Sequence, residues 1–363
     1  AIPYARQAQH DFSLCGDSFG LMISSFWLSM CAYNSSDESM FIEEIKKFAR
    51  LIVEEKYTFF IEKLTLYGPF DLQQFYPLIQ RAIKVDHEDE MLRQISQHLQ
   101  VVHTVSYPGY TLHINLLGPI SIKLGLNEVD DRKWQREKAK DLFVYLFIHR
   151  ERFIPKDELI RELFENQDEK TANRDFKVAL NALFNVLEPE RPPRAESYFI
   201  LRKQTMYRIH PKAAIISDVQ KFQQLASQGL EERNPQQAIE LLKSAVSLYK
   251  GAFYLDQSLC DWFQFERDHF HQTYLQVIEK LAQNSTRLQQ FDQTIYWSEK
   301  LLRIDNTWEE AYRLLMYAHD QKHNRSLAIM WYERCVKMLM QEFELPPMET
   351  TEQMYELITM GYS

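Results

Sequence analysis

Residues Lys170 to Leu187 read KTANRDFKVALNALFNVL, and this stretch decides how the middle of the chain folds. Apolar side chains recur in it at three- and four-residue spacing, which predicts an amphipathic helix. The side facing a core holds Ala172, Phe176, Ala179, Leu180, Leu183 and Leu187. The opposite side holds Lys170, Asn173, Arg174, Lys177 and Asn181. The helix therefore has one side for packing and one side that can meet water or a ligand.

The segments around this helix complete a small domain. Residues 110–117 and 120–124 alternate polar and apolar side chains across Gly118-Pro119, which predicts two short strands. Helical patterns follow over 134–148 and over 156–164, the second beginning directly after Pro155. Residues 198–202 and 206–210 alternate again and predict a second hairpin. Strands, three helices and a hairpin, in this order, predict a winged helix-turn-helix.

The flanks of this domain are helical. Residues 1–104 show helical periodicity, and residues 213–363 show it again together with an internal repeat. Ile295 aligns with Ile329, and Trp297 aligns with Trp331, at an offset of 34 residues. This is the period of tetratricopeptide helix pairs, which stack to cover one another's apolar faces. We therefore expect a mainly α fold with a small β component, in three parts: 1–104, 105–212 and 213–363.

Composition excludes several classes of protein. With 45% hydrophobic and 13% aromatic residues the chain has ample apolar surface to bury, so it is not disordered. Its nine glycines fit neither GxGxxG nor GxxxxGK[ST], which argues against a nucleotide-binding loop. No grouping of residues indicates an enzyme, a cofactor or a metal site. No apolar run is long enough to span a membrane, and four widely spaced cysteines are typical of a reducing cytoplasm, where we expect the protein to act.

Charge is distributed unevenly along the chain. The formal net charge is −9, which by itself argues against a nucleic-acid partner. Residues 110–212, however, hold 19 basic and 16 acidic residues, a net charge of +3, between two acidic flanks. A phosphate backbone responds to the local potential, so this segment is the candidate for binding DNA. Chance variation remains an alternative reading of so small an excess.

The polar side of the 170–187 helix carries side chains suited to base edges. Arginine and lysine bind guanine, and asparagine binds adenine, in the major groove. A helix of this kind enters that groove with its N-terminal residues against the bases. We therefore assign base reading to Lys170, Asn173, Arg174, Lys177 and Asn181. The competing reading is an ordinary solvated helix face, and Glu169 and Asp175 among the donors weaken the cationic pattern.

Three further basic elements surround this helix and favour the DNA reading. The second hairpin, which would be the wing, carries Arg202, Lys203 and Arg208. Basic residues gather at the start of the first helix, at Lys133, Arg136, Lys138 and Lys140. Lys156 lies in the first turn of the second helix, where backbone N–H groups also attract phosphate. Such residues would position the domain on the DNA backbone while the helix reads the bases.

Several motifs resemble a known family. The stretches WQREKAK (134–140), NRDFKVALNAL (173–183) and LEPER (187–191) resemble the winged-helix domain of antibiotic-regulator-type bacterial activators. The stretches LYKG (248–251), WEEAYR (308–313) and FELPP (343–347) resemble the bacterial transcriptional activator domain that follows it in that family. The match covers about residues 110–358, in the order that the family has. Residues 1–104 resemble the last helical repeats of larger regulators, so we expect the chain to be part of a longer protein.

The resemblance implies a transcription activator that binds double-stranded DNA. Members of the family typically bind direct repeats, which implies self-association, and contact RNA polymerase. It further implies that the acidic loop before the reading helix, with Glu165, Asp168 and Glu169, faces the polymerase, although a plain solvated loop is the alternative. A second hypothesis is a helical-repeat scaffold or adaptor whose winged helix docks proteins and has no affinity for DNA.

Overall fold

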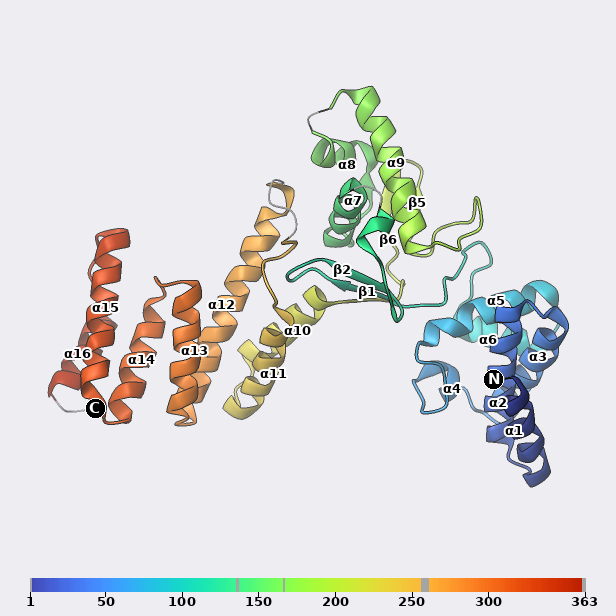
Figure 1. The fold of residues 1–363 in the computed structure, drawn as a ribbon, viewed down its shortest axis with the longest axis horizontal. Helices are drawn as coiled ribbons and strands as arrows, with labels where there is room; N and C mark the ends of the chain where they lie inside the picture. Colours follow the sequence, from blue (N-terminus) through green and yellow to red (C-terminus); the bar gives the residue numbers. More distant parts are fainter. Residues whose placement is uncertain (1, 135–136, 166, 256–260, 361–363) are drawn as a thin grey trace. The chain divides into compact units, whose positions relative to one another are not determined.

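The computed structural model describes residues 2–134, 137–165, 167–255 and 261–360 (Figure 1). The chain forms two compact units, one of residues 1–113 and 122–215 and one of residues 114–121 and 216–363. Helices dominate both units, and the strands are short. The predicted class, mainly α with a small β component, is confirmed. The predicted division at residues 105 and 213 stays a prediction.

The first unit begins with six helices: α1 (Ile2–Cys15), α2 (Ser18–Ser35), α3 (Glu38–Glu54), α4 (Phe59–Glu62), α5 (Phe75–Val85) and α6 (Glu90–Leu99). An aspartate caps three of them by accepting a hydrogen bond from the backbone N–H three residues on, at Asp17, Asp37 and Asp89. An aromatic cluster with ring centroids 4.9 to 6.1 Å apart forms the core, from Phe26, Phe48, Phe60 and Phe75.

The winged-helix elements follow in the predicted order. They are β1 (Leu112–Asn115), β2 (Ser121–Leu124), β3 (Asn127–Glu128), α7 (Glu137–Ile148), β4 (Ile154–Pro155), α8 (Lys156–Leu163), α9 (Glu169–Leu187), β5 (Ile200–Lys203), β6 (Met206–Ile209) and β7 (Ile215–Ser217). The sheets have the strand orders β3-β2-β1-β7 and β4-β6-β5. The sequence did not predict β3, β7 or the short strand β4, because strands of two or three residues have no visible alternation. Strand β4 pairs with the hairpin through Ile154 opposite Tyr207 and Pro155 opposite Met206.

The first helix of the domain starts later than its sequence pattern predicted. A 3₁₀ turn covers Asp131–Trp134, and α7 begins at Glu137. The third helix matches its prediction closely. All six core residues predicted for it are buried, at 8% exposure or less. Phe176 of α9 packs edge-on against Tyr207 of the hairpin, with ring centroids 5.6 Å apart, so the wing and α9 share one core.

The second unit is a row of helices: α10 (Asp218–Glu231), α11 (Pro235–Leu248), α12 (Gln264–Arg287), α13 (Phe291–Ile304), α14 (Glu309–Gln321), α15 (Arg325–Phe343) and α16 (Glu349–Met360). Each packs beside the next in the chain (Figure 1). The residues that align at an offset of 34 fall on α13 and α15, each the first helix of a pair. The sequence repeat therefore corresponds to a repeat in the structure, and helical repeats flank the winged helix on this side.

A buried carboxylate ties residues 116 and 117 into the second unit. Asp218, the first residue of α10, accepts hydrogen bonds from the backbone N–H groups of Leu116 and Leu117, each at 2.9 Å. Burial raises the pKa of Asp218, and these hydrogen bonds oppose the shift. Gly118 follows with φ +122, and a Cβ there would lie 3.2 Å from the Cβ of Lys250. Gly118, opposite the LYKG motif (248–251), is therefore favoured, because any other residue would be strained at this φ and its Cβ would press against Lys250.

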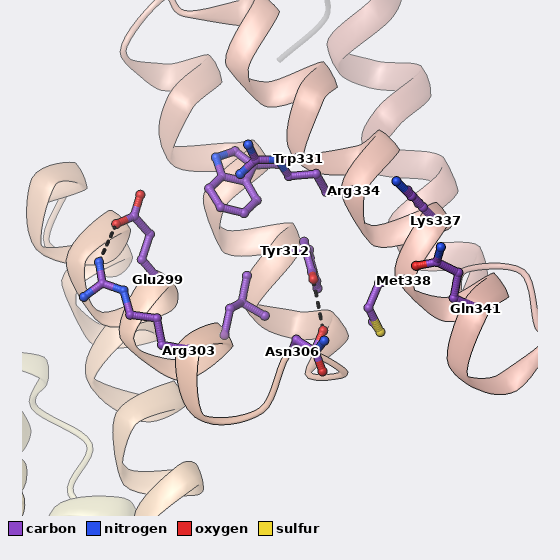
Figure 2. A pocket seen from close by; sticks show the side chains of 10 residues that line it. Glu299, Arg303, Asn306, Tyr312, Trp331, Arg334, Lys337, Met338 and Gln341 are labelled. Carbon is purple, nitrogen blue, oxygen red and sulfur yellow. Dashed lines mark hydrogen bonds and ion pairs between the residues drawn. The ribbon is translucent and has the colours of Figure 1, made fainter.

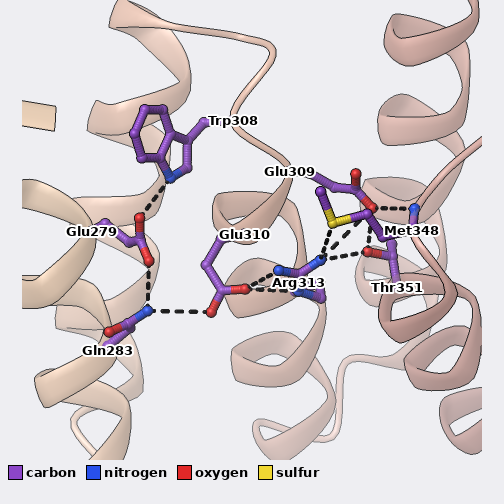
Figure 3. A network of polar contacts seen from close by, with 8 residues as sticks. All are labelled: Glu279, Gln283, Trp308, Glu309, Glu310, Arg313, Met348 and Thr351. Carbon is purple, nitrogen blue, oxygen red and sulfur yellow. Dashed lines mark hydrogen bonds and ion pairs between the residues drawn. The ribbon is translucent and has the colours of Figure 1, made fainter. Parts of the chain in front are cut away.

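A network of polar contacts joins α12, α14 and α16 (Figure 3). The guanidinium of Arg313 donates to the Glu310 carboxylate, with Nε at 2.7 Å, and to the Thr351 hydroxyl at 2.9 Å. On the other side, Trp308 donates its indole N–H to Glu279 at 2.9 Å. The WEEAYR motif (308–313) therefore holds three helices together, which gives it a structural role.

Candidate nucleic-acid interface

An aspartate cap fixes where the candidate reading helix α9 begins. The Asp168 carboxylate accepts a hydrogen bond from the Thr171 backbone N–H at 3.0 Å. Hydrogen bonds from Thr171 hold the pKa of Asp168 below its ordinary value. Because the cap sets the register of the helix, it also sets which side chains point away from the core.

The polar side of α9 is open to solvent. Lys170, Lys177 and Asn181 are exposed, and none of them makes a hydrogen bond or ion pair through its side chain with the part of the chain that the structure describes. Arg174 is 71% exposed, and its Nε lies 3.1 Å from the carboxylate of the neighbouring Asp175. Four of the five predicted base-reading residues thus present their polar groups outward along α9.

Asn173, the fifth, is already engaged within the domain. Its side-chain oxygen accepts a hydrogen bond from the Lys156 ammonium, and its NH₂ group donates to the Glu169 carbonyl at 2.8 Å. Both ends of the amide are therefore occupied. Asn173 could read an adenine only by exchanging these bonds for bonds to the base.

Lys156 differs from its expected role at the start of α8. Its backbone N–H donates to the Thr205 carbonyl at 2.8 Å, so this group is not free for a phosphate. Its ammonium lies 5.9 Å from the centre of the Phe176 ring and contacts Asn173. The structure thus brings together two residues predicted for different parts of the DNA, and Lys156 links α8 to both α9 and the wing.

The tip of the wing carries two exposed cations, Arg202 and Lys203. Arg202 donates from Nε to the Gln204 carbonyl at 3.0 Å and lies over the Tyr207 ring, which holds its guanidinium in place. Gln204 has φ +56, the left-handed conformation that closes the turn. The Lys203 side chain makes no hydrogen bond or ion pair within the described residues.

Arg208, on the second strand of the wing, is used by the fold. Its Nε donates to the Arg150 carbonyl at 2.9 Å, and its guanidinium lies 5.8 Å from the centre of the Phe153 ring. These contacts tie β6 to the end of α7. Arg208 is half-buried, so any DNA contact would come from the guanidinium nitrogens that do not donate to the Arg150 carbonyl.

The basic cluster before and within α7 is partly neutralised. Lys138 pairs with the buried carboxylate of Asp141 at 3.1 Å, and Lys140 pairs with Asp131 at 2.7 Å. Lys133 is exposed and makes no side-chain ion pair in the described part of the chain. Arg136 lies outside the described residues. Among the described cations of this cluster, Lys133 is the one most available to a phosphate.

One residue of the acidic loop before α9, Asp168, has a structural role. Glu165 and Glu169 are exposed, as a contact surface would require. Asp168 is committed to its cap, so its loss would shorten α9 as well as change the loop.

Two features of this surface were missed by the sequence analysis. Val178, 37% exposed, lies on the open side of α9 beside Arg174 and Lys177, and an apolar side chain there can contact a thymine methyl group. Its place one turn after Arg174 could have indicated it. Glu158 accepts hydrogen bonds from the Tyr145 hydroxyl and from Arg152, both at 3.0 Å, and joins α7 to α8. Nothing in the sequence pattern indicates that triad.

Comparison with known proteins identifies the second unit. Residues 217–359 match the family model of the bacterial transcriptional activator domain. No curated protein matches the chain significantly. The matched family is one of transcriptional activator domains.

The fold is shared with a solved structure. The structure of Mycobacterium tuberculosis EmbR in complex with a low-affinity phosphopeptide is similar, with a TM-score of 0.61 at 20% sequence identity. The similarity covers 70% of this chain and 66% of the EmbR chain. With the activator domain, this confirms the predicted resemblance to antibiotic-regulator-type activators. Among the described residues, no helix is long and apolar enough to cross a membrane.

Proposed function

We propose that the chain is a sequence-specific transcription activator that binds double-stranded DNA. In this proposal α9 lies in the major groove and the wing lies on the backbone. The observation that carries it is the open side of α9, where Lys170, Arg174, Lys177 and Asn181 point outward and have no partner from another element among the residues that the structure describes. The activator domain supports the same proposal, because it is a domain of transcription regulators.

In this proposal the residues on the open side of α9 read the bases. Arg174 and Lys177 suit guanine, Asn181 suits adenine, and Val178 suits the methyl group of thymine. Lys170, at the start of the helix, and Asn173, after exchange of its bonds, complete the set. Because the ion pair between Arg174 and Asp175 is exposed, it is weak, and a base edge can replace it.

In this proposal cations outside α9 contact the phosphate backbone of the DNA. Lys203 and Lys133 are exposed and make no side-chain ion pair within the described residues, and Arg202 is held at the wing tip by Tyr207. Lys138, Lys156 and Arg208 are engaged in the fold and would contribute through the field of their charges. Such contacts position the domain and add salt-dependent affinity.

The remaining partners follow from activator function. We propose that Glu165, in the loop before α9, and Glu169, at the start of α9, face RNA polymerase. Asp168 would fix the shape of the loop through its helix cap. Two copies of the chain would bind a direct repeat, with the helical repeats of the second unit bringing them together. A protein that acts on bacterial promoters works in the cytoplasm.

Selection from a random duplex library with the full chain tests the proposal. We expect one motif to be enriched, and we expect the enriched duplex to bind more tightly than a scrambled duplex of the same composition. Arg174→Ala should remove that preference and leave binding to the scrambled duplex unchanged. Absence of enrichment, with no binding to any duplex, would contradict the proposal and favour the scaffold, whose winged helix docks proteins.

A further inference from the structure

The activator domain contains a groove whose lining residues differ in charge from the rest of the domain. It lies between α13, α14 and α15 and has a volume of about 450 Å³ (Figure 2). Its lining combines aromatic, cationic and acidic side chains: Tyr312, Trp331, Arg303, Arg334, Lys337 and Glu299. Nothing in the proposed DNA interface uses these residues.

The charge of the groove is opposite to that of its unit. Residues 213–363 hold 14 basic and 21 acidic residues, so the unit as a whole repels anions. The groove gathers three cations around one acid, Glu299, which is paired with Arg303 at 3.3 Å. Arg334 and Lys337 are exposed and make no ion pair with the described part of the chain. Two positive charges are therefore left for an anionic ligand.

The aromatic side chains hold one of these charges in place. The guanidinium of Arg334 lies 4.7 Å from the centre of the Trp331 ring, a cation–π contact. The Tyr312 ring lies beside that of Trp331, and its hydroxyl donates to the Asn306 carbonyl at 3.0 Å. In Figure 2 the Arg334 side chain lies beside the Trp331 ring. A ligand in the groove would therefore meet aromatic side chains with a fixed cation next to them.

The lining has the form of a track. Trp331, Arg334, Met338 and Gln341 lie on one side of α15, and a helix rises about 1.5 Å per residue, so the track is about 15 Å long. An extended peptide advances about 3.3 Å per residue, so roughly four or five residues would fill it. This length suits an extended segment better than a compact small molecule.

We propose that this groove binds an extended acidic peptide segment of a partner protein. Carboxylates of the segment would pair with Arg334 and Lys337, and an apolar side chain would pack on Trp331 and Tyr312. A duplex is disfavoured here, because the acidic unit would repel its phosphates over a wider surface. The proposal does not depend on DNA binding by α9.

Fluorescence anisotropy with the full chain tests this proposal. The probe is the labelled hexapeptide Asp-Glu-Phe-Asp-Glu-Leu, and its amide counterpart Asn-Gln-Phe-Asn-Gln-Leu is the control. We expect the acidic peptide alone to bind, with affinity that falls as salt rises. Lys337→Glu should weaken binding about tenfold, because it replaces an attraction with a repulsion. Lys243→Glu, the same reversal at an exposed lysine of α11, should leave binding unchanged.

Four other outcomes would overturn the proposal. Equal binding of the two peptides would show that charge is not recognised, and equal loss in both variants would show that the groove is not the site. Absence of binding by the acidic peptide would contradict it directly. Displacement of the peptide by an unlabelled duplex, lost in Lys337→Glu, would assign the groove to nucleic acid. Equal melting temperatures of the two variants confirm that both are folded.

Discussion

Arg174 on α9 and Arg313 on α14 are the same residue type on two amphipathic helices, and the molecule uses them differently. The Arg313 side chain is 18% exposed and is bound by Glu309, Glu310 and Thr351. The Arg174 side chain is 71% exposed, and within the described part of the chain it pairs only with the adjacent Asp175. A cation held by three partners on two helices fixes a fold, whereas an exposed cation contributes little to stability and stays available to a ligand.

The largest effect is expected at the paired arginine. Arg313→Ala removes the cation that pairs with the carboxylates of Glu309 and Glu310, so it should lower the free energy of unfolding by about 3 kcal/mol. Urea unfolding followed by circular dichroism measures this. Arg303→Ala is the matched control, because Arg303 is 74% exposed. An equal, small loss in both variants would remove the distinction between the two kinds of arginine.

Replacing the exposed Arg174 should affect DNA binding more than it affects stability. Arg174→Ala should weaken binding to the selected duplex by about 1–3 kcal/mol if it makes a bidentate base contact, and Lys177→Ala should act in the same direction. Stability should change by less than about 1 kcal/mol. Titration of the selected and scrambled duplexes measures both effects on affinity. Equal loss on the two duplexes would refute a base-reading role.

A third, smaller effect depends on pH. The hydrogen bonds from Arg152 lower the pKa of Glu158, so its contribution to stability is present above the unfolded value of about 4.3 and is lost as pH falls through the folded pKa. Glu158→Gln should therefore lower stability by about 1 kcal/mol at neutral pH, and the difference should vanish in acid. Thermal unfolding across this range checks it, with the exposed Glu165→Gln as control. A difference that does not change with pH would contradict the assignment.

The smallest effect is expected at the wing. Lys203→Ala should weaken binding to all duplexes alike, by less than about 1 kcal/mol, because a phosphate contact carries no sequence information. The slope of log affinity against log salt should become shallower by about 1. Loss confined to the selected duplex would instead make Lys203 a base reader.

Periodicity predicted the helices well, because the buried side of α9 depends on spacing that the sequence displays directly. The offset of 34 residues predicted the repeat of α13 and α15 for the same reason. Partners of single side chains could not be predicted. The engagement of Asn173 by Lys156, of Arg208 by the Arg150 carbonyl and of Asp168 by Thr171 depends on contacts between elements or on where a helix begins. A list of basic residues therefore overstates how many cations are available.

The salt dependence of duplex binding by the full chain tests the central claim most directly. The exposed cations Lys133, Arg202 and Lys203 make no ion pair within the described residues, and each phosphate that they neutralise adds about −0.9 to the slope of log affinity against log salt. We predict a slope of roughly −3 or steeper on the selected duplex. A slope near zero, or no measurable binding at low salt, would show that the open side of α9 faces water and would contradict the account.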